Sequence, residues 1–372
     1  MPDGNWPWQK AIEKVLDKEE TPALIINKTV IKQKYQEFSS QFVRGKIYYA
    51  LKANPHPGIV ELLQERGCDF EISSQGELEL LLRLGVPVEK IISSNPVKDQ
   101  AFIKSAYSSG INLFAFDSSA EIEKLARFAP GSQVYVRLAV SNEGSEWPLS
   151  KKFGAEVEEA AELLVQAKRI GLKPYGIAFH VGSQCTNATT WAKAIEKSKV
   201  VWELAAERGI GLKMLNIGGG FPIKYLKPVP SIAEIARVIK DTLAEAFPDG
   251  VELILAPGRA LVGEAGTLIA TVMAKAVRAS ERWLYLDVGV FNGLMETVGG
   301  IKYPMMTKKG SKTSQWVLAG PSCDSFDVIS NEAELPELDI GDRVYIMSAG
   351  AYTTAYASQF DGFPIPKTHF IE

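Results

Sequence analysis

A lysine ends an apolar and aromatic run in the sequence YYALK, which closes at Lys52. Burying an ammonium group is costly, so a lysine at such a place needs an explanation. Its charged end extends to solvent or pairs with a carboxylate such as Glu71, or the amine has a chemical task. A desolvated lysine amine is a nucleophile that condenses with carbonyl groups. Lys52 is therefore a candidate Schiff-base lysine, with the structural alternatives left open.

Two further features suit an anion. The run Gly218–Gly220, followed by Phe-Pro, offers backbone N–H groups that can approach an anion closely. Arg259 follows a Pro-Gly turn and can bind a phosphate with two N–H groups. Glycine clusters often only form turns, so either feature alone is weak. His180, in HVGS, is another candidate, although an isolated histidine is more often a core residue.

The elements that must position these residues alternate between short apolar runs and amphipathic helical patterns. Eight β-then-α units predict a (β/α)8 TIM-like barrel, which we favour over an open doubly wound sheet. The predicted strands are 47–52, 69–73, 90–94, 112–117, 133–140, 176–182, 213–220 and 252–258.

Three segments are predicted. Residues 1–22 form an N-terminal segment that packs on the β domain, and residues 23–261, which open with the apolar run ALII, form the cofactor-binding barrel. Residues 262–372 form a mostly antiparallel β domain, because apolar runs follow one another there with few helical patterns between them. These runs are 268–277, 283–289, 315–320 and 343–350.

Active sites of such barrels lie at the carboxyl ends of the strands, and phosphates commonly bind after strands seven and eight. The glycine run and Arg259 fall at that place, which strengthens the prediction of a phosphate site. The other residues at or near predicted strand ends are Lys52, Glu71, Ser73, Asn95, Asp117, Arg137, His180 and Ser183.

Composition excludes several classes of protein. The 372 residues carry a formal charge of −3, which argues against a general nucleic-acid binder. No uninterrupted apolar stretch approaches the roughly 18 residues of a membrane span. Three cysteines point to reduced thiols and a cytoplasmic protein. The three histidines and three cysteines are scattered without metal-ligand spacing, so we expect no metal.

Two segments of the β domain are dense in small and polar residues: GPSCDSFD at 320–327 and GAYTTAYASQFDGF at 350–363. They are either two surface loops or a pair of loops that close a site.

Six motifs in order carry a resemblance to a known family: YYALKANP, FHVGSQ, NIGGGFP, Pro-Gly-Arg, GPSCDS and GAYTTAYASQFDGF. The chain resembles the pyridoxal phosphate-dependent decarboxylases of the alanine-racemase-like barrel fold, from about Ala23 to Phe363. Within that family it is most similar to the ornithine/lysine decarboxylases.

The resemblance implies a role for each matching residue. Lys52 would hold pyridoxal 5'-phosphate covalently and assist proton transfer, and His180 would stack on the pyridine ring. Cys323 would protonate the substrate carbon after carbon dioxide leaves, and Asp324 would bind the distal amine. Glu71, where the family usually has Asp, and Arg137 would lie beside the cofactor. The residues implied for phosphate binding are Ser183, Gly219, Gly220, Gly258, Arg259 and Tyr352.

The resemblance also implies a homodimer, with the GPSCDS loop reaching the active site of the partner. The expected activity is decarboxylation of ornithine, lysine or both to a diamine, as in polyamine biosynthesis. Glu296 is expected to help Asp324 bind the terminal ammonium, unless it is a solvated surface residue. Diaminopimelate or arginine decarboxylation, and an amino-acid racemase on the same fold, are alternatives. A non-catalytic cofactor carrier is disfavoured by the second domain.

One residue departs from the family motif. Glu-Pro-Gly-Arg is usual after strand eight, its glutamate holding the pyridine nitrogen protonated, whereas this chain has Ala256. A methyl group cannot supply that hydrogen bond, so the residue implies impaired or altered activity. Ala256 marks either an engineered variant or a natural branch with altered chemistry; the other motifs, all intact, favour the first.

Overall fold

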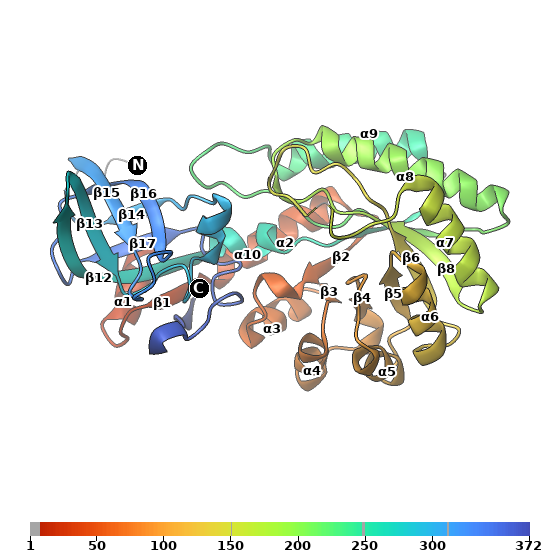
Figure 1. Cartoon of the computed structure of the whole chain (residues 1–372), viewed down its shortest axis with the longest axis horizontal. Coiled ribbons are helices and arrows are strands. Elements are labelled where there is room, and N and C mark those ends of the chain that lie inside the picture. The colour runs from red at the N-terminus through yellow and green to blue at the C-terminus, as the bar shows by residue number, and fades with distance from the viewer. Residues whose placement is uncertain (1–7, 150, 248–249, 311) are drawn as a thin grey trace. The chain divides into compact units, whose positions relative to one another are not determined.

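The computed structural model describes residues 8–149, 151–247, 250–310 and 312–372. Part of the predicted N-terminal segment, 1–7, lies outside them. The chain divides into two compact units (Figure 1). The barrel unit comprises Lys34–Pro222 and Val229–Gly258, and the β unit comprises Met1–Gln33, Ile223–Pro228 and Arg259–Glu372.

The first unit is a closed parallel barrel, which confirms the predicted fold. Every barrel strand predicted from the sequence contains or overlaps one strand of the observed barrel. The pairing of β10 with β8 closes the ring. In chain order the barrel strands are β2 (Gly45–Ala50), β3 (Asp69–Ile72), β4 (Ile91–Ser93), β5 (Leu113–Phe116), β6 (Gln133–Arg137), β8 (Lys173–Ala178), β10 (Met214–Asn216) and β11 (Glu252–Leu255).

Apolar side chains from the strands fill the barrel interior, as expected for a packed core. Seven of the eight strands contribute to one cluster: Tyr48, Ile92, Ala115, Tyr135, Ala178, Met214 and Ile254. Filling the interior leaves the carboxyl ends of the strands as the place for polar chemistry.

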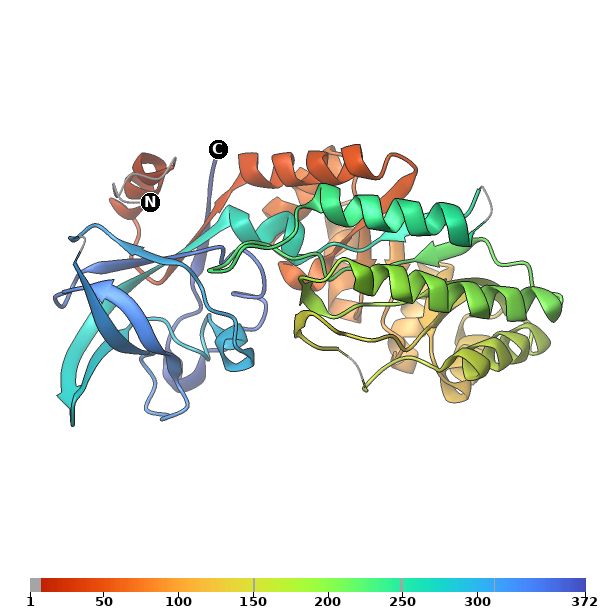
Figure 2. The same ribbon diagram turned by 90° about the horizontal axis from the view of Figure 1, so that it is seen from above.

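Helices surround the strands (Figures 1 and 2), and α7, α8 and α9 lie side by side. Several begin where a side chain caps the free N–H groups of the first turn. Ser231, for example, accepts the N–H of Glu234, whose carboxylate accepts the N–H of Ser231. The helices are α2 (Lys28–Gln41), α3 (Pro57–Glu65), α4 (Gln75–Arg83), α5 (Gln100–Ser108), α6 (Ser119–Phe128), α7 (Val157–Arg169), α8 (Thr189–Glu207) and α9 (Ile232–Ala246).

The second unit is a mixed, mostly antiparallel sheet, as predicted. Its main path runs β14-β17-β12-β13-β15-β16, and β12 also pairs with β1. The strands are β1 (Ala23–Asn27), β12 (Gly266–Arg278), β13 (Glu281–Leu286), β14 (Met305–Thr307), β15 (Thr313–Ala319), β16 (Val328–Pro336), β17 (Arg343–Met347) and β18 (Lys367–Ile371).

The predicted start of the barrel at residue 23 differs from the structure. Strand β1 lies in the β sheet, antiparallel to β12 and parallel to β18. All five of its residues are buried. A short apolar run buried on both faces has the same pattern in a barrel as in the middle of another sheet, which explains the difference.

Helix α1 (Gln9–Leu16) packs on this sheet through Ile12 and Leu16, which share a core cluster with Ile269 and Tyr345. The Tyr345 hydroxyl donates to the Glu13 carboxylate at 2.9 Å.

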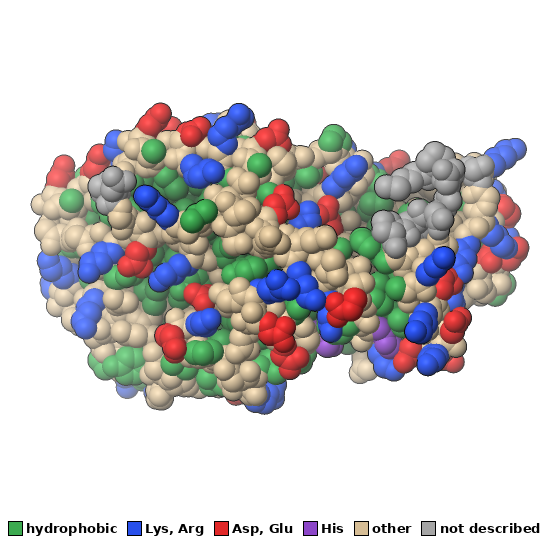
Figure 3. Space-filling model, turned by 180° about the vertical axis from the view of Figure 1, so that it is seen from behind, with side chains coloured by type: hydrophobic (Ala, Val, Ile, Leu, Met, Phe, Trp, Pro, Cys, Tyr) green, Lys and Arg blue, Asp and Glu red, His purple; other side chains and the backbone are tan. Residues whose placement is uncertain are grey.

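The surface carries charges of both signs. On the face in Figure 3, Lys and Arg side chains are interspersed with Asp and Glu side chains. Within the described ranges, the structure contains no helix long and apolar enough to cross a membrane.

Candidate active site

Lys52 lies in a single 3-10 turn, Leu51–Ala53, that directly follows strand β2. Its neighbours Leu51 and Ala53 are buried, whereas the lysine side chain is exposed. The Tyr49 hydroxyl donates to the carbonyl oxygen of Asn54 at 3.0 Å, which ties the chain after the turn to the strand before it. The fold therefore presents the Lys52 amine from a rigid base.

His180 follows strand β8 and is half-buried. Its Nδ1 accepts the N–H of Gly182 at 3.0 Å, which puts the ring proton of the neutral imidazole on Nε2. Burial lowers the pKa of His180 well below its usual value, and the charges of Arg137 and Lys52 lower it further. The ring is therefore neutral at physiological pH and suited to stacking on a flat, apolar group.

Charged groups of both signs gather at these strand ends. Arg137 closes β6, and burial lowers its pKa while the carboxylate of Glu71 on β3 opposes that shift. Burial raises the pKa of Glu77, although its carboxylate accepts the N–H of Ser73 at 2.6 Å. The charge of Lys52 also lowers the pKa of Glu77.

Hydrogen bonds of its peptide groups hold the glycine run after β10 in place. Gly218 donates to Asn216 Oδ1 at 2.8 Å, and the carbonyl of Gly220 accepts the N–H of Cys185 at 2.8 Å. A Cβ at Gly219 would lie 2.5 Å from the Ala256 carbonyl oxygen, and one at Gly220, where φ is +90°, would lie 2.3 Å from that of Gly182. Only glycine fits this cradle.

Within the described ranges, the N–H groups of Gly219 and Gly220 have no hydrogen-bond acceptor. Two such donors in a glycine cradle suit a phosphate. Gly258, which ends the barrel unit, packs close to the lysine turn, because a Cβ there would lie 2.9 Å from that of Ala53.

In the β unit, the structure brings Arg259 together with two other predicted site residues. Arg259 begins α10 (Arg259–Val262), and its guanidinium carbon lies 4.9 Å from the centre of the Tyr352 ring. Its Nη1 and Nη2 donate to the two oxygens of Glu296 at 2.6 and 2.5 Å. The contacts of Glu296 therefore differ from the predicted one with a substrate ammonium.

Two tyrosines around this pair are not among the predicted site residues. The Tyr225 hydroxyl accepts a hydrogen bond from Arg259 Nη1 at 2.6 Å, and the Tyr225 and Tyr303 rings meet edge to face at 5.3 Å. Burial raises the pKa of Tyr303, and the charges of Tyr225 and Glu296 add to the shift. Tyr225 lies in no motif of the sequence. Tyr303 lies in residues 287–304, which resemble the specificity segment of the family, but nothing in the sequence marks the tyrosine within it.

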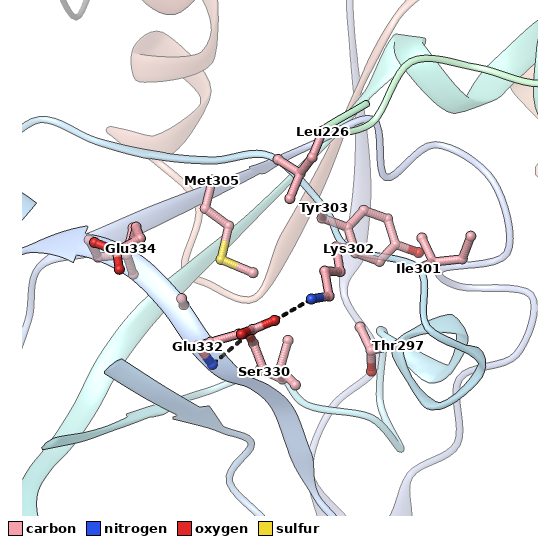
Figure 4. A pocket seen from close by; sticks show the side chains of 12 residues that line it. Leu226, Thr297, Ile301, Lys302, Tyr303, Met305, Ser330, Glu332 and Glu334 are labelled. Atoms are coloured by element: carbon pink, nitrogen blue, oxygen red, sulfur yellow. Dashed lines mark hydrogen bonds and ion pairs between the residues drawn. The ribbon is translucent and has the colours of Figure 1, made fainter. Parts of the chain in front are cut away.

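Tyr303 also lines a cavity of about 280 Å³ in the β unit (Figure 4). Its walls combine apolar side chains such as Met305 with the ion pair of Lys302 and Glu332. Glu334 stands at the same cavity.

The GPSCDS loop connects β15 to β16 and presents Cys323 and Asp324, both exposed. Asp327 anchors the loop, because its buried carboxylate accepts bonds from Ser322 Oγ at 2.7 Å and from the N–H of Val290 at 2.7 Å.

The Cys323 N–H donates to Asp361 Oδ2 at 3.1 Å, which links the two predicted loops. A hydrogen bond to Asp361, and its charge, raise the pKa of the Cys323 thiol. The thiol therefore keeps its proton, as a proton donor must.

Comparisons with known proteins place the chain in a family. Residues 28–263 match the family model of the pyridoxal-dependent decarboxylases, pyridoxal binding domain. The lysine/ornithine decarboxylase of Selenomonas ruminantium is 36% identical over 371 residues, covering 98% of this chain and 93% of that protein.

Solved structures agree. SrLDC in complex with PLP and cadaverine superposes with a TM-score of 0.92 at 34% identity, covering 100% of this chain and 95% of that one. The lysine/ornithine decarboxylase of Vibrio vulnificus complexed with putrescine has a TM-score of 0.91 at 35% identity, covering 98% of each chain.

The residues present fit pyridoxal phosphate: an exposed lysine amine on a rigid turn, a neutral histidine ring and a glycine cradle with two N–H donors. With the family match and the likeness over the whole length, the chain belongs to the pyridoxal phosphate-dependent decarboxylases.

Proposed function

We propose that this protein decarboxylates ornithine, lysine or both to the corresponding diamine. Likeness over nearly the whole length to a lysine/ornithine decarboxylase carries the proposal. Structures of similar proteins hold cadaverine and putrescine, the diamines derived from lysine and ornithine. The exposed carboxylate of Asp324 suits the distal ammonium of such a substrate.

When bound, pyridoxal phosphate supplies a conjugated ring that takes up the electron pair left when carbon dioxide departs. Lys52 would hold the cofactor through Nζ and would later assist proton transfer. The neutral imidazole of His180 packs against the ring without adding a charge. Glu71 and Arg137, whose charges interact at the strand ends, would lie beside the cofactor.

The phosphate is bound by backbone N–H groups and by one cation. Gly219 and Gly220 offer peptide donors from the cradle, and Arg259 supplies the positive charge. Ser183, Gly258 and Tyr352 complete the set. Tyr352 packs on Arg259, which favours a binding role over that of a racemase base.

The protonation step belongs to Cys323. Its Sγ, kept protonated beside Asp361, donates the proton to the α-carbon after carbon dioxide leaves. Asp324, next to it in the chain, binds the distal amine. Because the proton donor and the carboxylate that binds the distal amine are neighbours in the chain, together they hold the substrate in one orientation.

We further propose that the protein is a homodimer in which the loop with Cys323 and Asp324 completes the site of the partner. Mixing inactive Lys52→Ala with inactive Cys323→Ala tests this arrangement. Random exchange of subunits gives hybrid dimers with one intact site, so about a quarter of the wild-type activity should return. If native mass spectrometry shows hybrid dimers but no activity returns, both residues act in the site of one subunit.

The exposed Cys323 thiol also suits a reducing compartment such as the cytoplasm.

The activity is tested by incubating the protein and pyridoxal phosphate with ornithine, lysine, arginine or diaminopimelate. Mass spectrometry of the amines, carbon dioxide release and chiral analysis of the remaining amino acid are measured together. We expect putrescine or cadaverine, and none from Lys52→Ala. Agmatine as the main product, lysine formed from diaminopimelate, or racemised substrate without an amine would refute the assignment.

A further inference from the structure

We propose that Glu296 is a positioning residue that orients Arg259 for the cofactor phosphate, and that it does not bind the amino-acid substrate. The inference rests on the proposed role of Arg259 in phosphate binding. It assigns Glu296 a different task from the one expected from the sequence.

The contact is bidentate. One N–H of each Nη atom of Arg259 points at a separate oxygen of Glu296, at 2.6 and 2.5 Å. Another N–H of Nη1 points at the Tyr225 hydroxyl at 2.6 Å. Two parallel bonds between planar groups fix the plane of the guanidinium as well as its position, which a single bond cannot do.

The surroundings exclude water. The side chains of Arg259 and Glu296 are each 3% exposed. The Tyr225 and Tyr352 rings both lie within 6 Å of the guanidinium carbon, and both residues belong to the β unit, as do Arg259 and Glu296. A buried ion pair held in this way loses its orientation when one partner is removed, because the remaining charge seeks other acceptors.

The same contacts argue against substrate binding. Both Glu296 oxygens already face the arginine, and Tyr303 adds a further neighbour on the carboxylate. A substrate ammonium would have to displace these partners from both oxygens of the carboxylate. Asp324, exposed on its loop, meets no such obstacle.

The variant Glu296→Gln tests the hydrogen bonds that orient Arg259 while the size of the side chain stays nearly the same. Its amide keeps one acceptor oxygen, but the NH2 group meets an Nη donor, so one of the two fixing bonds is lost. In metal sites, loss of a partner that orients a ligating side chain costs about 10- to 100-fold in affinity, and we take the same range for this arginine. We expect a loss of that size for phosphate-bearing ligands in Glu296→Gln.

The experiment starts from the apoprotein, from which the cofactor has been removed. It is titrated with pyridoxal phosphate and, separately, with pyridoxal, which lacks the phosphate. Absorbance and fluorescence report binding to wild type, Glu296→Gln, Arg259→Ala, the double variant and Glu334→Gln. Glu334 is a matched control, because it is an exposed carboxylate of the same unit.

We expect Glu296→Gln to weaken pyridoxal phosphate by about 10- to 100-fold and pyridoxal by less than about twofold. The double variant should bind like Arg259→Ala alone, since Glu296 acts through the arginine. Glu334→Gln should match the wild type. At saturating cofactor, the KM for lysine and ornithine in Glu296→Gln should stay within about threefold.

Several results would overturn the inference. Unchanged cofactor affinity with a KM raised more than about tenfold would make Glu296 a substrate ligand. Equal weakening of both cofactor forms would make its role purely structural. If Arg259→Ala binds pyridoxal phosphate like wild type, the proposed role of Arg259 fails with it. If only Glu296→Gln does so, the role of Arg259 stands and this inference alone fails.

Tyr225→Phe covers the case in which Glu296→Gln does not fold. This variant removes one acceptor from Arg259 and keeps the ring. We expect the same selective loss for the phosphorylated cofactor, smaller in size. A Tyr225→Phe protein that loses affinity equally for both cofactor forms would count against the positioning role.

Discussion

The peptide N–H of Ala256 donates to the carbonyl oxygen of Gly218 at 2.9 Å. This bond ties the residue after β11 to the start of the glycine cradle. A Cβ added at Gly219 would lie 2.5 Å from the Ala256 carbonyl oxygen and 3.5 Å from His180 Nε2. Position 256 is therefore a buried neighbour of the histidine proposed to stack on the cofactor, where the family motif usually places a glutamate.

We expect Ala256→Glu to raise the rate of decarboxylation. A carboxylate at this position keeps the pyridine nitrogen protonated, which strengthens the ring as an acceptor of electrons. The gain should be about 10- to 1000-fold in kcat, the size of a strong electrostatic contact. Single-turnover carbon dioxide release with lysine or ornithine measures it.

Ala256→Gln is the matched control, since it has nearly the same size and no charge. It should recover only a small part of the gain. An Ala256→Glu protein that folds, binds the cofactor and is no faster than the wild type would show that Ala256 is not a defect, and that the electron sink of this branch is tuned in another way.

The barrel could be predicted because its strands are apolar runs separated by regular helices, and its polar residues fall at strand ends. The predicted barrel segment includes β1, because burial on both faces leaves no sign of which sheet a strand joins. The short strands β7 (Ser145–Trp147) and β9 (Ser183–Cys185) pair with each other and were not foreseen. Their three-residue lengths give too few positions for an alternating pattern.

The candidate site was predictable where motifs lie at strand ends, and less so where contacts join distant positions. The ion pair of Arg259 and Glu296 spans 37 positions, and the bond from Arg259 to Tyr225 spans 34. A sequence shows that a glutamate and an arginine are present, but not that they meet. The substrate role expected for Glu296 rests on its charge and on the resemblance of residues 287–304 to the specificity segment of ornithine/lysine decarboxylases, neither of which shows what the side chain contacts.

Asp324→Asn should weaken productive binding of basic substrates. Loss of a charge-assisted hydrogen bond costs about 1.5–3 kcal/mol, so kcat/KM for lysine should fall by about 10- to 100-fold. Norleucine, which has the chain of lysine without its amine, serves as the control substrate, and its low rate should not change. An equal loss for both compounds would show that Asp324 does not contact the distal amine.

Asp361→Asn should make Cys323 more reactive. The carboxylate of Asp361 raises the thiol pKa by a hydrogen bond and by its charge, so its removal shifts the pKa down and increases the thiolate fraction at pH 8. Alkylation by iodoacetamide should be several-fold faster. Cys68 and Cys185 are buried, so the fast phase reports Cys323. Unchanged kinetics, confirmed by peptide mapping of the alkylated residue, would remove Asp361 as the cause of the shift.

His180 should make the stability of the apoprotein depend on pH. Because burial and two cations lower its folded-state pKa well below 6.5, the unfolded chain takes up a proton below that pH while the folded chain does not. Folding stability from this group is therefore complete above pH 6.5 and is lost as pH falls. The free energy of unfolding then falls by up to about 1.4 kcal/mol per pH unit.

Urea unfolding measures the free energy of unfolding at pH 7.5 and at pH 5.5. Between these two values it should drop more for the wild type than for His180→Phe. Burial also lowers the pKa of His56, but that contribution is common to both proteins and cancels in the difference. Equal drops would mean that the folded state protonates His180 as readily as the unfolded chain does.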